Sequence, residues 1–251
     1  MRADQLLVER GLAATRSQAQ RLIAAGVQWR VGDQAWLSVS KNGEELPLVC
    51  ELQLLDDAET RYVSRGGLKL EGALLQTGLN VNGWVCLDVG QSTGGFTDCL
   101  LQQGAAQVWG VDVGHSQLHP RLQADARVHA LEKINARQLN AAALGEQGLE
   151  GFDLVVADLS FISLTLVIPA MQLLMKPQAH ALWLVKPQFE LQAHDLGKGG
   201  VVKNTALYVQ VEQRLRKACA SAGLQVLSWL QSPIVGGDGN QEFFIHARRA
   251  A

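Results

Sequence analysis

The hydrophobic pattern of the first part of the chain predicts two short helices followed by a hairpin. The first helix ends at Gly11, a common helix terminator. The capping-box sequence Thr15-Arg16-Ser17-Gln18 begins a second helix, and Gly26 follows it at a position typical of a left-handed residue. Residues 27–31 and 35–39 flank a Gly-Asp turn, as the strands of a hairpin do.

From residue 68 onward the pattern changes to apolar strands that alternate with helices. Helices are predicted at 68–77 and 205–222, and a further helix follows the glycine-rich loop after strand 85–89. Strands are predicted at 85–89, 108–111, 154–157, 181–185, 225–230 and 243–247. This alternation predicts an α/β fold with a mainly parallel sheet covered by helices on both faces. Ligands of such sheets bind beyond the carboxyl ends of the strands, so the chemistry is expected there.

A polar segment at residues 56–63 follows a strand-like run at 49–55 and is the best candidate for a linker. It predicts a small N-terminal domain, residues 1–60, and a larger domain, residues 64–251. The chain has 251 residues, of which 47% are hydrophobic and 18% charged. That composition is sufficient for a substantial core and excludes a disordered tail or a coiled coil.

The net charge of −2 conceals an uneven distribution of charge. Residues 1–30 and residues 186–217 each carry a net charge of +3, which predicts two local basic surfaces within an acidic remainder. The first residues contain no secretory signal, and the most apolar helical stretch, 164–175, is too short to span a bilayer. We therefore expect a cytoplasmic protein with no membrane partner. The cysteines and histidines are scattered, so no metal site is expected.

A glycine-rich loop with the sequence Asp88-Val-Gly-Gln-Ser-Thr-Gly-Gly-Phe-Thr97 lies between an apolar strand and a helix. Glycines let a backbone approach a ligand closely, and the helix N-terminus offers free N–H groups. The next strand ends at Asp112, whose carboxylate is suited to accept hydrogen bonds from ribose hydroxyls. These features indicate a nucleotide-like ligand, and both NAD and S-adenosylmethionine contain such a ribose.

Charged residues at the ends of apolar strands form a second set of candidates. Asp158 and Lys186 each follow a strand, and Glu242 precedes one. Unpaired buried charges are costly, so these residues are expected to pair. With Lys69, on the helix before the first strand of the sheet, they predict two lysines and two carboxylates at the rim of one crevice.

Six ordered motifs in this sequence resemble those of the TlyA (hemolysin A) family, a branch of the FtsJ-like methyltransferases. They span residues 65–70, 88–97, 158–164, 185–190, 197–202 and 236–242. Residues 2–32 also resemble the α-L RNA-binding module of the ribosomal protein S-four type. The resemblance covers nearly the whole chain. It implies a Rossmann-like S-adenosylmethionine-dependent methyltransferase domain preceded by a small RNA-binding domain.

The resemblance also implies an activity and its residues. Members of the family methylate the ribose 2′-hydroxyl of cytidine in ribosomal RNA, with S-adenosylmethionine as methyl donor. Gln91 stands where the family more often has a small residue, which slightly weakens a role for its side chain and leaves the role of its backbone unaffected. The catalytic tetrad corresponds to Lys69, Asp158, Lys186 and Glu242. The cofactor-binding residues correspond to Asp88, Gly90, Ser92, Thr93, Gly94, Gly95, Phe96, Asp112, Val113, Asn135, Ala136 and Asp158.

A ribose hydroxyl is a poor nucleophile near neutral pH, so the residues of the tetrad are expected to deprotonate and align it. We hypothesise that Lys186 is the base or the hydroxyl-orienting group, and that Lys69 positions it and modulates its pKa. Ser160 and Phe161 are expected beside the transferred methyl, although a core position for Phe161 is an equal alternative. Phosphate-binding roles are predicted for Arg2, Arg16, Arg21, Lys198 and Lys203.

Three other functions are compatible with parts of the sequence. A non-catalytic RNA-binding or ribosome-assembly factor would not need the intact tetrad. A cytolysin would be expected to carry a signal, a membrane span or a strongly basic amphipathic helix. An NAD-dependent oxidoreductase is disfavoured by the altered glycine spacing and by the lysine pair. The preferred partner is ribosomal RNA or a ribosomal subunit, and the sequence indicates no oligomeric state.

Overall fold

The computed structural model describes residues 1–55 and 58–250, which form two compact units, Met1–Arg65 and Gly66–Ala251. Residues 56–57 of the expected linker lie outside the described residues. The described part of that segment includes a short helix, α3 (Ala58–Arg61). No helix in the described part of the chain is long and apolar enough to cross a bilayer.

The N-terminal unit contains two helices and a three-stranded antiparallel sheet of order β2-β1-β3. The predicted helices and hairpin are confirmed, and the third strand comes from the run at 49–55. Thr15 caps the second helix, because its side chain accepts a hydrogen bond from the Gln18 backbone N–H at 3.2 Å. Gly26 has a φ of +122°, so the prediction of a positive φ was correct. The elements are α1 (Ala3–Glu9), α2 (Arg16–Gly26), β1 (Val27–Arg30), β2 (Leu37–Ser38) and β3 (Glu51–Leu54).

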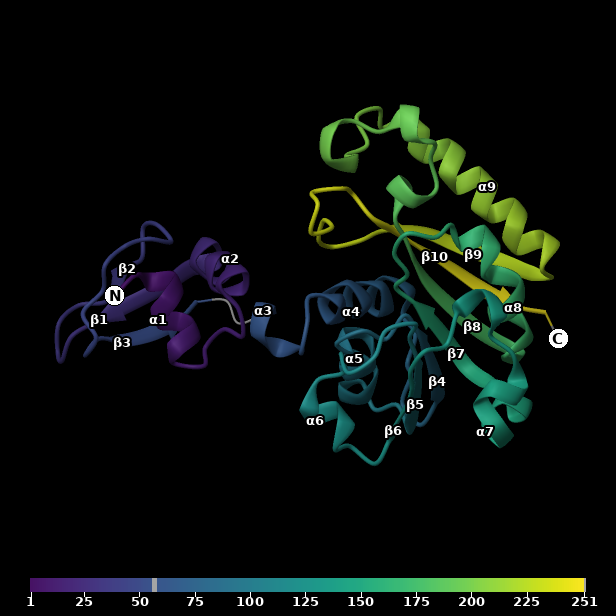
Figure 1. Ribbon diagram of the computed structural model, residues 1–251, viewed down its shortest axis with the longest axis horizontal. Helices are drawn as coiled ribbons and strands as arrows, with labels where there is room; N and C mark the ends of the chain where they lie inside the picture. Colours follow the sequence, from purple (N-terminus) through teal and green to yellow (C-terminus); the bar gives the residue numbers. More distant parts are fainter. Residues whose placement is uncertain (56–57, 251) are drawn as a thin grey trace. The chain divides into compact units, whose positions relative to one another are not determined.

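The C-terminal unit contains a seven-stranded sheet of order β6-β5-β4-β7-β8-β10-β9 (Figure 1). The strands are β4 (Val85–Val89), β5 (Gln107–Val111), β6 (Val128–Leu131), β7 (Phe152–Ala157), β8 (Met175–Val185), β9 (Leu224–Gln231) and β10 (Phe243–Arg249). The helices are α4 (Gly66–Thr77), α5 (Gly95–Gln102), α6 (Pro120–Gln123), α7 (Gly145–Glu150), α8 (Ile168–Leu173) and α9 (Leu207–Ser221). Single 3-10 turns are η1 (Ala136–Gln138), η2 (Ala141–Leu144), η3 (Leu164–Leu166), η4 (Pro187–Phe189), η5 (Ala193–Asp195) and η6 (Lys198–Gly200).

Five neighbouring strands, from β6 to β8, pair in parallel, whereas β10 runs antiparallel to both β8 and β9. The mainly parallel sheet was therefore predicted correctly. Strand β6 was not predicted. Its four residues alternate poorly and none is fully buried, so it carries little of the apolar signal that marks the central strands.

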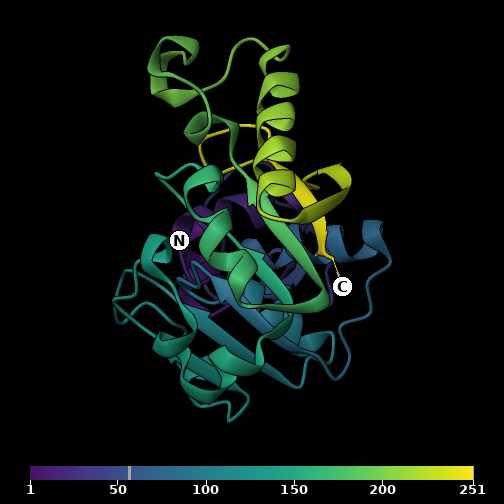
Figure 2. The ribbon, with the colours of Figure 1, turned by 90° about the vertical axis from the view of Figure 1, so that its right-hand side faces the viewer.

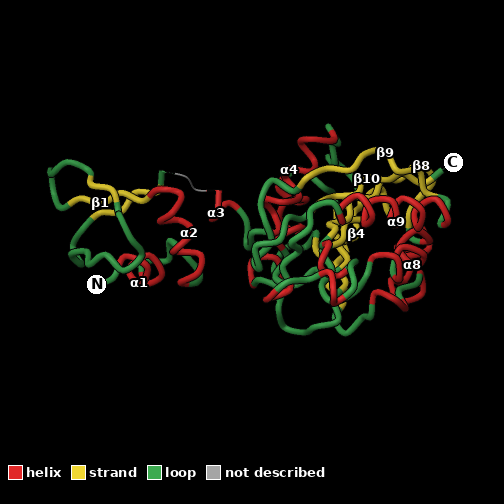
Figure 3. The backbone as a smooth tube through the Cα atoms, turned by 90° about the horizontal axis from the view of Figure 1, so that it is seen from above, coloured by secondary structure: helices red, strands yellow, loops and turns green. Residues whose placement is uncertain are grey.

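Helices cover both faces of this sheet, which forms an inner layer between them (Figure 3). Successive residues of β10 show the two layers, because side chains of a strand alternate between faces. Phe243 and Ile245 belong to the core that includes Leu215 of α9. Phe244 points the other way and stacks on Phe96 of α5, with 6.0 Å between the ring centroids. The sheet is therefore buried on both faces.

The topology brings charged residues from several elements to one edge of the sheet. Asp158 follows β7 and Lys186 follows β8, at the carboxyl ends of two parallel strands. Glu242 precedes the antiparallel β10, whose amino end lies at that same edge. The green segment 191–206, between β8 and α9, projects from the body of the unit in both Figure 1 and Figure 2. It adjoins this edge through its contacts with the loop before β10.

Candidate active site

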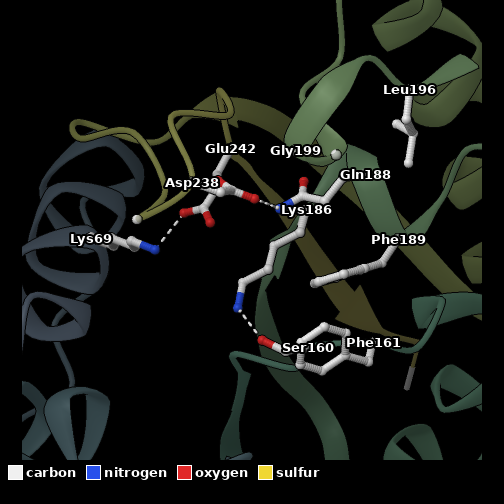
Figure 4. A pocket seen from close by; sticks show the side chains of 12 residues that line it. Lys69, Ser160, Phe161, Lys186, Gln188, Phe189, Leu196, Gly199, Asp238 and Glu242 are labelled. Atoms are coloured by element: carbon white, nitrogen blue, oxygen red, sulfur yellow. Dashed lines mark hydrogen bonds and ion pairs between the residues drawn. The ribbon is translucent and has the colours of Figure 1, made fainter.

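Two lysine–carboxylate pairs form the centre of the site, and Figure 4 shows one of them, Lys69 with Glu242. Lys69 Nζ of helix α4 lies 2.5 Å from Glu242 Oε2, and both side chains are buried. Lys186 Nζ lies 2.5 Å from Asp158 Oδ1 and donates a hydrogen bond to Ser160 Oγ at 2.9 Å. All four residues predicted at the strand ends and on α4 therefore belong to one cluster, in which each lysine has a carboxylate partner.

The pKa of the Glu242 carboxyl is influenced by residues of both pairs. Burial raises its pKa above the ordinary value, and the charge of Lys69 opposes this rise. Lys186 also lowers the pKa of Glu242 and Asp158 raises it. The pKa of Glu242 therefore depends on the charges of both lysines.

A cavity of about 490 Å³, called the lysine cavity below, opens onto this cluster. Lys69, Lys186 and Glu242 line it together with the aromatic rings of Phe161 and Phe189, whose centroids are 5.1 Å apart. Phe161 is 91% exposed and has a φ of +64°. The alternative that Phe161 is a core residue is therefore wrong. The cavity combines ionisable groups on one side with aromatic surface on the other.

Buried hydrogen bonds hold the glycine-rich loop in place. Asp88 Oδ2 accepts from the Thr97 backbone N–H at 3.0 Å and from Thr97 Oγ1 at 2.7 Å. The Gln91 side chain donates to the same hydroxyl at 2.9 Å and fills the space that a side chain at Gly110 would need. Burial raises the pKa of Asp88 to about 7. The side chain of Gln91, for which only a weakened role was expected, thus supports the loop.

A second cavity, also of about 490 Å³ and called the nucleoside cavity below, lies beyond the ends of β4 and β5. Asp112 is fixed in its wall, because its two carboxylate oxygens accept from the backbone N–H groups of Ser92, at 2.8 Å, and Gly114, at 2.7 Å. Gly90 must be a glycine here, since a Cβ would lie 2.5 Å from the carbonyl oxygen of Asp158. The residues predicted to bind a cofactor that line this cavity are Gly90, Ser92, Asp112, Val113, Asn135, Ala136 and Asp158.

The other predicted cofactor residues do not line the cavity. Asp88, Gly94, Gly95 and Phe96 are buried, and Thr93 is exposed outside the lining. Gly94 begins helix α5 with a φ of +93°, and a side chain there would clash with Leu122. These residues support the loop that forms the cavity wall.

The lining of the second cavity fits a nucleoside. The Asp112 carboxylate accepts hydrogen bonds, as binding of ribose hydroxyls requires, while Val113, Ile134 and Ile162 offer apolar surface for a base. Ser160 and Phe161 line both cavities. The two cavities therefore adjoin each other at Ser160 and Phe161, so ligands bound in both cavities would lie next to each other near Lys186.

Comparison with known proteins identifies this architecture. Residues 62–249 match the family model described as FtsJ-like methyltransferase. The chain belongs to the FtsJ-like methyltransferase family. The α/β fold and the methyltransferase activity expected from the sequence are thereby confirmed, and the family implies S-adenosylmethionine as the methyl donor.

Relatives of this FtsJ-like methyltransferase cover nearly its full length. The 16S/23S rRNA (cytidine-2′-O)-methyltransferase TlyA of Mycobacterium tuberculosis is 42% identical over 247 residues, which are 98% of this chain and 89% of the relative. A solved structure described as a hemolysin from Streptococcus thermophilus is 38% identical, with a TM-score of 0.75, and covers 100% of this chain and 88% of its own. The expected resemblance to the TlyA and hemolysin group is confirmed.

More distant methyltransferases share only the fold. A structure of an S-adenosylmethionine-dependent methyltransferase from Listeria monocytogenes is 12% identical, has a TM-score of 0.52, and covers 74% of this chain and 99% of its own. This likeness supports the interpretation of the larger unit as a methyltransferase sheet.

Two of the three arginines predicted to bind phosphate, Arg2 and Arg16, contact one buried acid in the N-terminal unit of this FtsJ-like methyltransferase. Asp4 accepts from Arg2 Nε at 3.0 Å, from Arg16 Nη2 at 2.9 Å and from Gln20 at 3.3 Å. These bonds, led by that of Arg2, hold the pKa of Asp4 well below its usual range. Arg21 donates to the Ser17 carbonyl at 3.1 Å.

Lys198 and Lys203, also predicted to bind RNA, are exposed on the projecting segment 191–206. Asn240, which is 1% exposed, fastens this segment to the loop that carries Glu242. It accepts from the Val202 N–H at 2.9 Å and donates to the Gly200 carbonyl at 3.1 Å. The segment is therefore tied to the loop that carries Glu242, which lines the cavity at the lysine cluster.

Several residues of the site were not predicted. Gln188 and Asp238 line the lysine cavity and share a hydrogen bond of 2.9 Å, and Glu190 is buried behind it. All three lie within motifs quoted for the family resemblance, so membership of those motifs was the available signal. The rule that charged residues at strand ends belong to the site could not find Glu190 and Asp238, because neither lies directly at the end of a strand.

Proposed function

We propose that this FtsJ-like methyltransferase transfers a methyl group from S-adenosylmethionine to the ribose 2′-hydroxyl of cytidine in ribosomal RNA. The observation that carries the proposal is the meeting of the two cavities at Ser160 and Phe161, directly beside Lys186 and its partner Asp158. The name of the Mycobacterium tuberculosis relative supports the substrate class.

S-adenosylmethionine supplies a methyl group on a sulfonium, which is already activated for transfer. Asp112 is the residue proposed to hold its ribose, with Val113, Asn135 and Ala136 beside the base. Asp158 is proposed to serve twice, because it lines this cavity and also pairs with Lys186. The cofactor and the substrate hydroxyl are then aligned by the same carboxylate, which lowers the entropic part of the barrier.

The task of the lysine cluster is to prepare the ribose hydroxyl. Lys186 is proposed to orient the hydroxyl and, in its neutral form, to accept its proton as the oxygen bonds to the methyl carbon and the sulfonium–methyl bond breaks. Asp158 and Ser160 fix the direction of the Lys186 amine. Glu242 pairs with Lys69, so the ammonium group of Lys69 is held at the cavity and is proposed to position the ribose.

Binding of the RNA backbone is proposed for residues outside this cluster. Arg2, Arg16 and Arg21 of residues 1–60, an S-four-type RNA-binding domain in this proposal, would contact phosphates without reading the sequence. Lys198 and Lys203 would do so beside the lysine cavity. The target is then selected by the shape of the RNA, in ribosomal RNA or an assembled subunit in the cytoplasm.

Transfer of an isotopic methyl group from S-adenosylmethionine to purified ribosomal subunits tests the proposal directly. The label is expected on the 2′-oxygen of a cytidine, and mapping of 2′-O-methylation in cells with and without the protein should find the same site. Label on a base, or no label with either subunit or free ribosomal RNA, would contradict the proposed function.

A further inference from the structure

A buried carboxylate that lines neither cavity links the two loops of the active site. Glu190 is 3% exposed and follows the turn η4, which starts directly after Lys186. Its Oε1 accepts from the Leu164 backbone N–H at 2.7 Å, and its Oε2 accepts from Ser163 Oγ at 2.7 Å. Arg214 of α9 donates to the same Oε2 at 2.6 Å and also to the Glu190 carbonyl.

The segments joined by Glu190 are those that carry the reacting groups. Ser163 and Leu164 end the loop that starts at Asp158 and contains Ser160 and Phe161. Ser163 also caps η3, because its side chain accepts from the Thr165 N–H. The loop is thus fixed at its far end by Glu190 and at its near end by strand β7. Between these ends, Ser160 meets Lys186 at 2.9 Å.

We infer that Glu190 is a positioning residue, which holds the 158–164 loop against the 186–190 turn so that Asp158 and Ser160 meet Lys186. This inference rests on the proposed function. Arg214 contributes by neutralising a carboxylate that would otherwise be buried with its charge unpaired. Hydrogen bonds to an ionised group are about twice as strong as neutral ones, which suits a contact that must fix a loop.

Replacement of the carboxylate by an amide tests this role while it preserves the shape of the side chain. In Glu190→Gln, the maximal rate of methyl transfer is expected to fall about 100-fold, because a displacement of about 1 Å at the reacting groups has that effect. The KM for RNA and the affinity for S-adenosylhomocysteine are expected to stay within about twofold, because Glu190 lines neither cavity. Glu212→Gln is the matched control, since Glu212 pairs with Arg216 on the same helix at 2.8 Å, away from both loops.

A second variant separates positioning from folding. Glu190→Gln leaves the Arg214 charge without its carboxylate, and Glu190→Gln with Arg214→Met removes that charge. If the rate returns to the wild-type value once thermal stability is restored, the role is structural and the inference is wrong. If the rate stays low in the stable double variant, Glu190 positions the loop.

Hydrogen exchange gives a readout that does not depend on activity. Peptides that cover residues 159–166 are expected to exchange faster in Glu190→Gln, whereas those of the 112–117 cavity wall are unchanged. Unchanged exchange in residues 159–166 would overturn the inference, even if wild-type protein failed to methylate ribosomal RNA. Failure of the wild-type transfer alone would contradict the proposed function and leave the exchange result to decide the role of Glu190.

Discussion

In the N-terminal unit one buried carboxylate, Asp4, accepts hydrogen bonds from Arg2, Arg16 and Gln20. In the C-terminal unit each of the two lysines of the site pairs with a different carboxylate. The pKa of Asp4 is lowered by its arginine partners, but the pKa of Glu242 is raised by burial. Guanidinium groups stay charged at all physiological pH values, and lysines readily change pKa when they are buried.

The difference distinguishes a cluster of permanently charged arginines from a cluster of lysines that is proposed to prepare the ribose hydroxyl. The Asp4 cluster presents fixed, half-exposed positive groups, which suits binding of phosphates. In the lysine cluster Lys69 and Glu242 are buried, whereas the side chains of Lys186 and Asp158 are 12% and 24% exposed. Four experiments test this contrast, from the largest expected effect to the smallest.

Removal of the proposed base should have the largest effect. Lys186→Ala is expected to lower the maximal rate of methyl transfer by about 10²- to 10⁴-fold, the usual range for loss of a general base, with RNA binding retained. Single-turnover transfer of labelled methyl and a separate RNA-binding assay measure the two quantities. Lys217→Ala, an exposed lysine of α9, is the control and should behave as wild type. Full activity in Lys186→Ala would disprove the assignment.

Breaking the buried pair should cost more stability than breaking an exposed one. Glu242→Gln leaves the Lys69 charge buried and is expected to lower the free energy of unfolding by about 3–5 kcal/mol. Removal of both charges, in Glu242→Gln with Lys69→Met, should recover much of this loss. Glu51→Gln, which breaks the exposed pair with Arg30, should cost at most about 1 kcal/mol. Urea unfolding monitored in each unit measures these values, and equal losses at the two pairs would remove the contrast.

Loss of one arginine from the Asp4 cluster should affect RNA binding and spare the chemistry. Arg16→Ala is expected to weaken RNA binding several-fold and to reduce the slope of log affinity against log salt by about 1. The rate at saturating RNA should be unchanged. Arg127→Ala is the matched control, because Arg127 is also half-exposed and paired with an aspartate. A lower saturated rate in Arg16→Ala would mean that the arginine acts in catalysis.

The smallest effect should appear as a dependence of stability on pH. Because the pKa of Asp4 is lower in the folded protein than in the unfolded chain, its contribution is fully present above about pH 4. The contribution is lost as the pH falls below that value and Asp4 takes up a proton. Asp4→Asn should therefore destabilise the N-terminal unit by about 1 kcal/mol at pH 7 and by less at pH 3. A destabilisation that grows at low pH would contradict the assigned charge state.

The sequence predicted the elements whose signals are local. Apolar runs marked the central strands, and Thr15 marked the start of α2 through its capping contact. Lys69, Asp158, Lys186 and Glu242 could be grouped because each lies near the end of an element, and the sheet brings such ends together. A mainly parallel sheet was therefore sufficient to indicate where the site lies.

Features that depend on distant contacts could not be predicted. The contact between Glu190 and Arg214 joins a turn to a helix 24 residues away, and no local pattern specifies it. The sequence could not decide between a core position and a site position for Phe161, whose side chain is 91% exposed in the structure. The antiparallel direction of β10 follows from its place between β8 and β9, which only the assembled sheet defines.

That place has a consequence for the order in which the protein is built. Strand β10 is the last strand of the sheet to be synthesised, yet it lies between two strands made earlier, and β9 has no other neighbour among the described strands. A nascent chain that has reached β9 already contains both walls of the nucleoside cavity but still lacks the acid that pairs with Lys69. The Lys69–Glu242 pair can therefore form only late in biosynthesis, after β10 has been made and has joined the sheet.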